Sequence, residues 1–186
     1  FRIPPEEVTP ALRKSAKAIN FGIVYGISAF SLSQDLHISV AEAKEYIEHY
    51  MQTYPAIRGY LESSVEHAAE VGYTETLYGR RRYIPELKSA NGAVRALGRR
   101  MALNAPLQGT AADIVKMAMV RVARALAEEL PSARMIMQVH DELVLECPPE
   151  DADRAAEILR REMEGVGSDF PVPLTVDVEI GHNWLK

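Results

Sequence analysis

Two cations and two aromatic rings recur at four-residue intervals near the N-terminus: Arg13, Lys17, Phe21 and Tyr25. Residues four apart in an α-helix share one face, so a helix would gather all four on a single strip. Guanidinium and ammonium groups bind phosphates, and aromatic rings stack on bases with little preference for which base is present. The strip is therefore suited to a nucleoside triphosphate. The alternative is a half-exposed helix whose rings pack against a neighbouring helix, and Val24 on the same face favours it slightly.

A second candidate is the acidic turn His140-Asp141-Glu142, which lies between two apolar stretches. A carboxylate at a tight turn can hold a hard cation such as Mg²⁺. In nucleotidyl transfer, two metals about 4 Å apart activate the attacking hydroxyl and stabilise the leaving oxygen. The alternative is an aspartate favoured only by turn geometry, which is common.

The third candidate is a polar stripe formed by Arg100, Asn104 and Gln108, provided that a helix continues through Pro106. Minor-groove edges offer hydrogen-bond acceptors in every base pair, so donors from such a stripe can contact a well-formed pair without reading its identity. The alternative is a polar face lying in water.

These patterns resemble family A DNA polymerases, the bacterial DNA polymerase I type. Arg13-x3-Lys17-x3-Phe21-x3-Tyr25-Gly26 resembles their fingers-helix motif, and the His-Asp-Glu turn resembles their motif C. Residues 99–113 are similar to the helix that leads into the palm, and residues 76–82, Thr-Leu-Tyr-Gly-Arg-Arg-Arg, are similar to a loop of the same family. The resemblance runs almost from end to end of the chain.

The resemblance implies a role for each candidate residue. Asp141 would be a catalytic metal ligand, Glu142 would have a secondary catalytic role, and Lys17 would serve both catalysis and triphosphate binding. Nucleotide binding would fall to Arg13, Lys17, Phe21 and Tyr25, and DNA binding to Arg100, Asn104, Gln108, His140, Arg80 and Arg81. The implied cofactor is Mg²⁺, two ions in the intact enzyme, and the implied partners are primer–template DNA and dNTP. The implied location is the bacterial cytoplasm, with association to the nucleoid.

One catalytic motif of the family is not found. The second metal-binding aspartate of these enzymes lies upstream of the fingers helix, but only twelve residues precede Arg13 and none forms that motif. We therefore expect the isolated chain to be inactive without the N-terminal part of the same polymerase. Removing the upstream palm strands should also leave an unpaired sheet edge, which predicts self-association.

Other functions stay open at this point. A non-catalytic nucleic-acid-binding module would bind primer–template without needing dNTP or Mg²⁺. A fragment of a single-subunit RNA polymerase is a second alternative, although those enzymes tend to follow His-Asp with Ser, where this chain has Glu142. A helical interaction domain with ordinary surface cations is the third.

The elements that must position these residues follow from capping and periodicity. We expect helices over residues 10–25, 39–53, 56–71, 91–130 and 150–166, with Pro106 and Gly109 bending the fourth. We expect a short strand pair within 73–83, strands at 134–139 and 143–147, and a last strand at 173–180. This order predicts an α+β fold, with a helical fingers lobe (residues 1–90) beside a small antiparallel palm sheet (residues 91–186).

Composition limits the class of protein. The 186 residues are 47% hydrophobic and 25% charged, which excludes a disordered chain. The net charge of −5 is uneven: residues 80–100 carry +6 and residues 128–186 carry −9. The basic segment is suited to a polyanion. The single cysteine, Cys147, excludes an internal disulfide, and the longest nearly apolar stretch, residues 19–30, is too short to span a bilayer.

Overall fold

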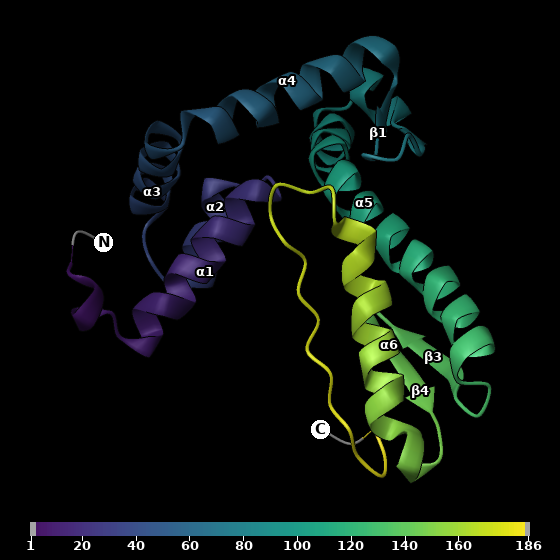
Figure 1. The fold of residues 1–186 in the computed structure, drawn as a ribbon. Coiled ribbons are helices and arrows are strands. Elements are labelled where there is room, and N and C mark those ends of the chain that lie inside the picture. The colour runs from purple at the N-terminus through teal and green to yellow at the C-terminus, as the bar shows by residue number, and fades with distance from the viewer. Residues whose placement is uncertain (1–2, 185–186) are drawn as a thin grey trace. The chain divides into compact units, whose positions relative to one another are not determined.

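The computed structural model of the protein describes residues 3–184 and confirms the α+β class (Figure 1). The chain forms two compact units, residues 1–108 (unit 1) and residues 109–186 (unit 2). The boundary falls inside the long helix α5 (Gly92–Glu129), so a single helix contributes to both units.

Four helices form the first part of unit 1: α1 (Pro10–Val24), α2 (Ala29–Leu36), α3 (Val40–Thr53) and α4 (Pro55–Val71). Their starts are fixed by side-chain caps or by proline. Thr9 caps α1, Ser28 caps α2, and Ser39 forms a reciprocal capping box with Glu42 on α3. A short 3₁₀ turn, η1 (Pro5–Glu7), precedes α1.

Unit 1 holds two apolar clusters. Ile19 and Ile23 of α1 pack with Leu32 of α2 and Ala43 of α3 in the first. The second joins α4 to α5 and to the 3₁₀ turn η2 (Pro85–Lys88); its buried members are Val65, Ala68, Ile84, Leu87 and Ala102. Between α4 and η2, strands β1 (Tyr73–Glu75) and β2 (Arg81–Tyr83) form an antiparallel hairpin, as predicted.

Unit 2 is built on the C-terminal part of α5, the hairpin β3 (Arg134–Val139) and β4 (Glu142–Glu146), and helix α6 (Ala152–Glu164). The 3₁₀ turns η3 (Pro149–Asp151) and η4 (Gly165–Gly167) flank α6. The core joins these elements through eight buried residues, which are Val122, Ala125, Leu126, Ala133, Leu143, Ala155, Ile158 and Leu159.

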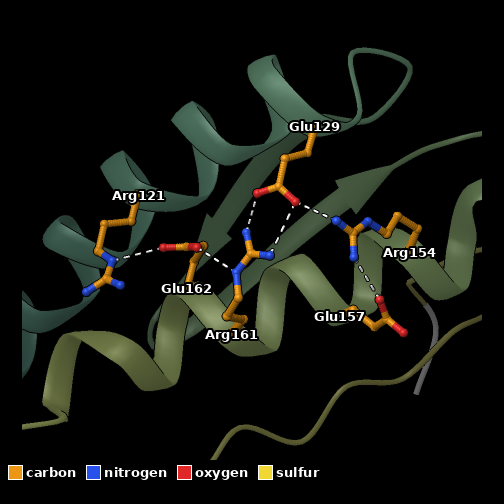
Figure 2. A network of polar contacts seen from close by, with 6 residues as sticks. All are labelled: Arg121, Glu129, Arg154, Glu157, Arg161 and Glu162. Atoms are coloured by element: carbon orange, nitrogen blue, oxygen red, sulfur yellow. Dashed lines mark hydrogen bonds and ion pairs between the residues drawn. The ribbon is translucent and has the colours of Figure 1, made fainter.

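A network of ion pairs connects α5 to α6 in unit 2 (Figure 2). Glu129 accepts hydrogen bonds from Arg161 and Arg154, and Arg161 also reaches Glu162, which in turn accepts from Arg121 at 3.0 Å. Hydrogen bonds from Arg161 hold the pKa of Glu129 and of Glu162 below their ordinary value. Part of the acidic charge of residues 128–186 is therefore neutralised within the unit.

The predicted strand at residues 173–180 is wrong. The segment is extended but forms no strand among the described residues, and β3 and β4 make a two-stranded sheet. Its backbone is instead bound by side chains of α6: the Val176 amide donates to Glu164 at 3.0 Å, and Arg160 donates to the Val176 carbonyl. Alternating apolar residues thus gave an extended conformation without a partner strand.

Three smaller differences concern the ends and number of elements. Helix α2 was not predicted, β4 begins at Glu142 rather than Leu143, and the expected helix 150–166 is confined to Ala152–Glu164 between two 3₁₀ turns. No helix in the described part of the chain is long and apolar enough to cross a membrane.

Candidate functional site

The cation–aromatic strip of α1 faces solvent. Arg13 and Lys17 are exposed, and Phe21 and Tyr25 keep 53% and 41% of their surfaces exposed. The two rings are stacked, with centroids 6.5 Å apart and planes inclined by 14°, and Lys17 Nζ lies 5.9 Å from the centroid of Phe21. The four side chains therefore form one surface, ordered by a cation–π contact and a ring stack.

The strip is exposed because the opposite face of α1 supplies the core. Ile19 and Ile23 are buried against α2 and α3. Because these residues occupy the apolar face of an amphipathic helix, the opposite face of α1 points away from the core. Neither ring of the strip belongs to a buried cluster of the described residues. Among the described residues, Phe21 and Tyr25 are therefore not part of a buried core.

Helix α1 ends directly after the strip in a Schellman motif. The Gly26 amide donates to the Ile23 carbonyl at 3.0 Å and the Ile27 amide to the Gly22 carbonyl at 2.8 Å, with Gly26 at φ +75°. The motif fixes where the chain turns away from Tyr25, so the second ring of the strip lies at the very end of the helix.

The polar stripe lies on α5, which continues through Pro106. Arg100 and Gln108 are exposed, whereas Asn104 is partly buried. The amide oxygen of Asn104 is buried without a hydrogen-bond partner in the described part of the chain. Unit 1 brings the stripe close to the end of the strip, because a Cβ placed on Gly26 would lie 3.7 Å from Arg100 Cγ.

The basic hairpin β1–β2 presents its arginines unequally. Arg81 pairs with Glu75 at 2.6 Å, and its guanidinium carbon lies 4.5 Å from the centroid of the Tyr73 ring. The hydrogen bond that Arg81 donates to Glu75 raises the pKa of Arg81 above its ordinary value. Arg81 therefore stabilises the hairpin itself, while Arg80 and Arg82 are exposed beside it.

The acidic turn lies in unit 2, at the tip of the β3–β4 hairpin. Val139 pairs with Glu142, so His140 and Asp141 form a two-residue loop. His140 has φ +54°, and its carbonyl accepts a hydrogen bond from the Gln138 side chain. Asp141 is exposed, Glu142 is partly exposed, and the next residue, Leu143, anchors β4 in the core. The hairpin thus exposes the Asp141 carboxylate two residues before a residue that is buried in the core.

The chemistry of this turn fits part of a Mg²⁺ site. Mg²⁺ is commonly held by one or two carboxylates, with water and substrate phosphates as the other ligands. Asp141 and Glu142 can supply such carboxylates. No group of three or more His, Cys, Asp or Glu side chains suited to a metal gathers among residues 3–184.

Sequence patterns did not indicate every residue that shapes the site. Gln138 supports the turn through the His140 carbonyl, and its only signal is its place two residues before the turn. The pairing of Arg81 with Glu75 was missed as well, although cross-strand register places the two residues opposite each other.

Comparison with known proteins defines the family. The family model described as DNA polymerase family A matches residues 1–186. The chain belongs to family A of the DNA polymerases. It is 49% identical over 186 residues to the thermostable DNA polymerase I of Thermus aquaticus, covering all of this chain and 22% of that protein. It is 48% identical over 184 residues to DNA polymerase I of Pseudomonas aeruginosa, covering 99% of this chain and 20% of that one.

A solved structure supports the same relationship. The structure titled "POL domain of Pol1 from M. smegmatis complex with DNA primer-template and dNTP" matches with a TM-score of 0.86 at 42% identity, covering 95% of this chain and 31% of that one. The chain therefore spans about a fifth of the length of these curated relatives and about a third of the solved domain.

Proposed function

We propose that these residues are the C-terminal part of a DNA-directed DNA polymerase, a nucleotidyltransferase that adds dNTPs to a primer 3′ end in DNA replication and repair. The observation that carries the proposal is the exposed strip Arg13–Lys17–Phe21–Tyr25 on a helix of a family A chain. The strip offers phosphate-binding cations at one end and stacked rings at the other.

In this proposal unit 1 binds the incoming nucleotide. Arg13 would bind phosphate oxygens in a bidentate manner, and Lys17 would neutralise charge that develops on the triphosphate during transfer. Phe21 and Tyr25 would form the apolar surface for base and sugar. Arg13 lies in the first turn of α1, where the helix dipole adds positive potential.

The turn of unit 2 would hold metal and primer. Two bound Mg²⁺ ions would supply activation of the primer hydroxyl and stabilisation of the leaving pyrophosphate. Asp141 would be the metal ligand from this chain, with Glu142 in a secondary role. His140 would position the primer terminus from the same turn. We propose that the isolated chain is inactive and needs the remainder of the polymerase, because the second metal-binding aspartate of the family motif is not found in it.

DNA contacts are assigned by the chemistry of the exposed groups. Arg100, Asn104 and Gln108 would contact the minor-groove edge of the newly formed pair, where acceptors occur in every base pair. Arg80 and Arg81 would lie along DNA phosphates, with Arg81 contributing mainly through the shape of the hairpin because Glu75 already pairs with it. We propose residues 1–90 as fingers and residues 91–186 as the connecting helix and palm part, with the compact units divided further along α5.

The test is primer extension by the complete polymerase with dNTPs and Mg²⁺. Arg13→Ala should raise the KM for dNTP about tenfold or more, since a charge-assisted phosphate contact is lost. Lys44→Ala is the matched control, because Lys44 is an exposed cation of unit 1 that lies on α3 rather than on α1. Equal effects of the two substitutions would contradict the assignment of the strip.

Three further outcomes separate the alternatives. Preference for NTPs over dNTPs would indicate an RNA polymerase. Binding of primer–template without dNTP- or Mg²⁺-dependent extension would indicate a binding module. Extension by the isolated 186-residue chain that disappears in Asp141→Ala would show that other carboxylates of this chain complete the metal site.

A further inference from the structure

Gly26, at the end of the strip on α1, contacts helix α5, which carries the polar stripe. A Cβ built on Gly26 would lie 2.9 Å from Leu103 Cδ1, closer than real Cβ contacts allow, and 3.7 Å from Arg100 Cγ. Leu103 is partly buried and packs against the buried cluster between α4 and α5, which restricts its movement. The Leu103 side chain of α5 therefore lies directly against Gly26 and leaves no space for a Cβ.

The neighbours of this contact are the residues on which the proposed function depends. Tyr25, the last ring of the strip, precedes Gly26 directly, and Arg100, the first residue of the stripe, lies one helical turn from Leu103. Ile27, on the other side of Gly26, packs against the α1–α2–α3 cluster. The contact thus links the two apolar clusters of unit 1. It lies between the strip proposed to bind the nucleotide and the stripe proposed to contact the base pair.

We propose that Gly26 is a positioning residue that sets the separation between the nucleotide strip and the polar stripe, and so determines how well dNTP binds once primer–template is in place. The inference rests on the proposed function. A side chain at position 26 would have to displace either the Leu103 side chain or the end of α1, because interiors do not absorb an added methyl group without movement. Tyr25 would then be shifted relative to the pair that Arg100 contacts.

A glycine at the end of a helix has a second reason to be there, and the two reasons can be separated. Gly26 has φ +75°, a conformation that disfavours any side chain regardless of space. Gly72 ends α4 at φ +87°, and a Cβ placed there meets nothing within 4 Å. Gly72→Ala therefore introduces the same backbone strain without the steric contact and is the matched control for Gly26→Ala.

The experiment measures KM for dNTP, kcat and primer–template Kd for the complete polymerase and its variants. Gly26→Ala should raise KM about tenfold more than Gly72→Ala does, with little change in the Kd for primer–template. Removing the Leu103 side chain relieves the clash, so the double variant Gly26→Ala/Leu103→Ala should recover most of the loss relative to Leu103→Ala alone.

Each result decides between explanations. Equal effects of Gly26→Ala and Gly72→Ala, or no recovery in the double variant, would overturn the positioning role and leave backbone strain as the cause. A fall in kcat that parallels a fall in thermal stability, with the KM for dNTP unchanged, would likewise show that Gly26 has only a structural role. An unsubstituted enzyme that extends no primer would instead refute the proposed function, and with it the positioning role of Gly26.

Discussion

Truncation of Ile158 tests whether the core of unit 2 supports the hairpin that presents Asp141. Ile158 of α6 is fully buried and belongs to the same cluster as Leu143, which lies two residues after Asp141. Truncation of a buried isoleucine to alanine typically costs about 2–5 kcal/mol, because the lost transfer free energy adds to the cost of the cavity. At about 0.05–0.15 kcal/mol per residue, a unit the size of residues 109–186 has roughly 4–12 kcal/mol in total. Ile158→Ala should therefore remove a large fraction of its stability.

The assay is urea unfolding followed by circular dichroism and by the fluorescence of Trp184, the single tryptophan of the sequence, which lies in unit 2. With an m value of about 1–3 kcal/mol/M, a loss of about 3 kcal/mol lowers the midpoint by roughly 1–3 M. Ile180→Ala is the matched control, since the same atoms are removed from a side chain that is 59% exposed. That variant should lose less than about 1 kcal/mol. Similar urea midpoints for the two variants would show that the Ile158 side chain does not stabilise the core of unit 2 by the expected amount.

The remaining predictions concern charge, sugar selection and association. Hydrogen bonds from Arg161 lower the pKa of Glu129 in the folded state, so that carboxylate stabilises unit 2 at a pH above its unfolded pKa of about 4.3, and the stabilisation is lost as the pH falls through the lowered value. In urea titrations between pH 7 and pH 3, Glu129→Gln should therefore lose less stability than the unsubstituted protein. Parallel curves of stability against pH would argue against the network. Phe21 has no hydroxyl to replace a missing 3′-OH of the ligand, so the complete enzyme should disfavour dideoxynucleotides and Phe21→Tyr should relax this preference; equal incorporation ratios in both proteins would count against it. The isolated chain should self-associate through the edges of the two-stranded sheet β3–β4, and light scattering that shows a monomer at high concentration would exclude this.

The helices of unit 1 were predictable where their ends carry local signals. Thr9, Ser39, Gly26 and Gly72 mark ends that the structure confirms to within a residue, because capping depends on side chains within one turn of the helix. Helix α2 also begins with a capping serine, but at eight residues it is too short to be stable alone. Its formation depends on burying Leu32 against α1 and α3, which is tertiary information.

The candidate site divides in the same way. The strip on α1 follows from a four-residue period, and the structure confirms that its side chains share one exposed face. The ion pairs of Glu129 with Arg154 and Arg161 join residues more than twenty positions apart, so no local period indicates them. The strand predicted at residues 173–180 is wrong for the opposite reason. The alternation of apolar residues is local, but a strand needs a partner strand, and side chains of α6 bind the Val176 backbone instead.

The acidic turn shows a departure from ordinary turn chemistry that bears on function. Two-residue hairpin loops favour glycine or asparagine wherever φ is positive, yet His140 occupies such a position at φ +54°. A side chain there costs about 1–2 kcal/mol, although histidine tolerates the conformation better than most residues. The Gln138 side chain offsets part of that cost by donating to the His140 carbonyl. A turn optimised only for stability would not need this support, because glycine would adopt the conformation freely. Backbone strain beside Asp141 is typical of a functional site, and this favours the proposal that the His140 imidazole is used at the primer terminus.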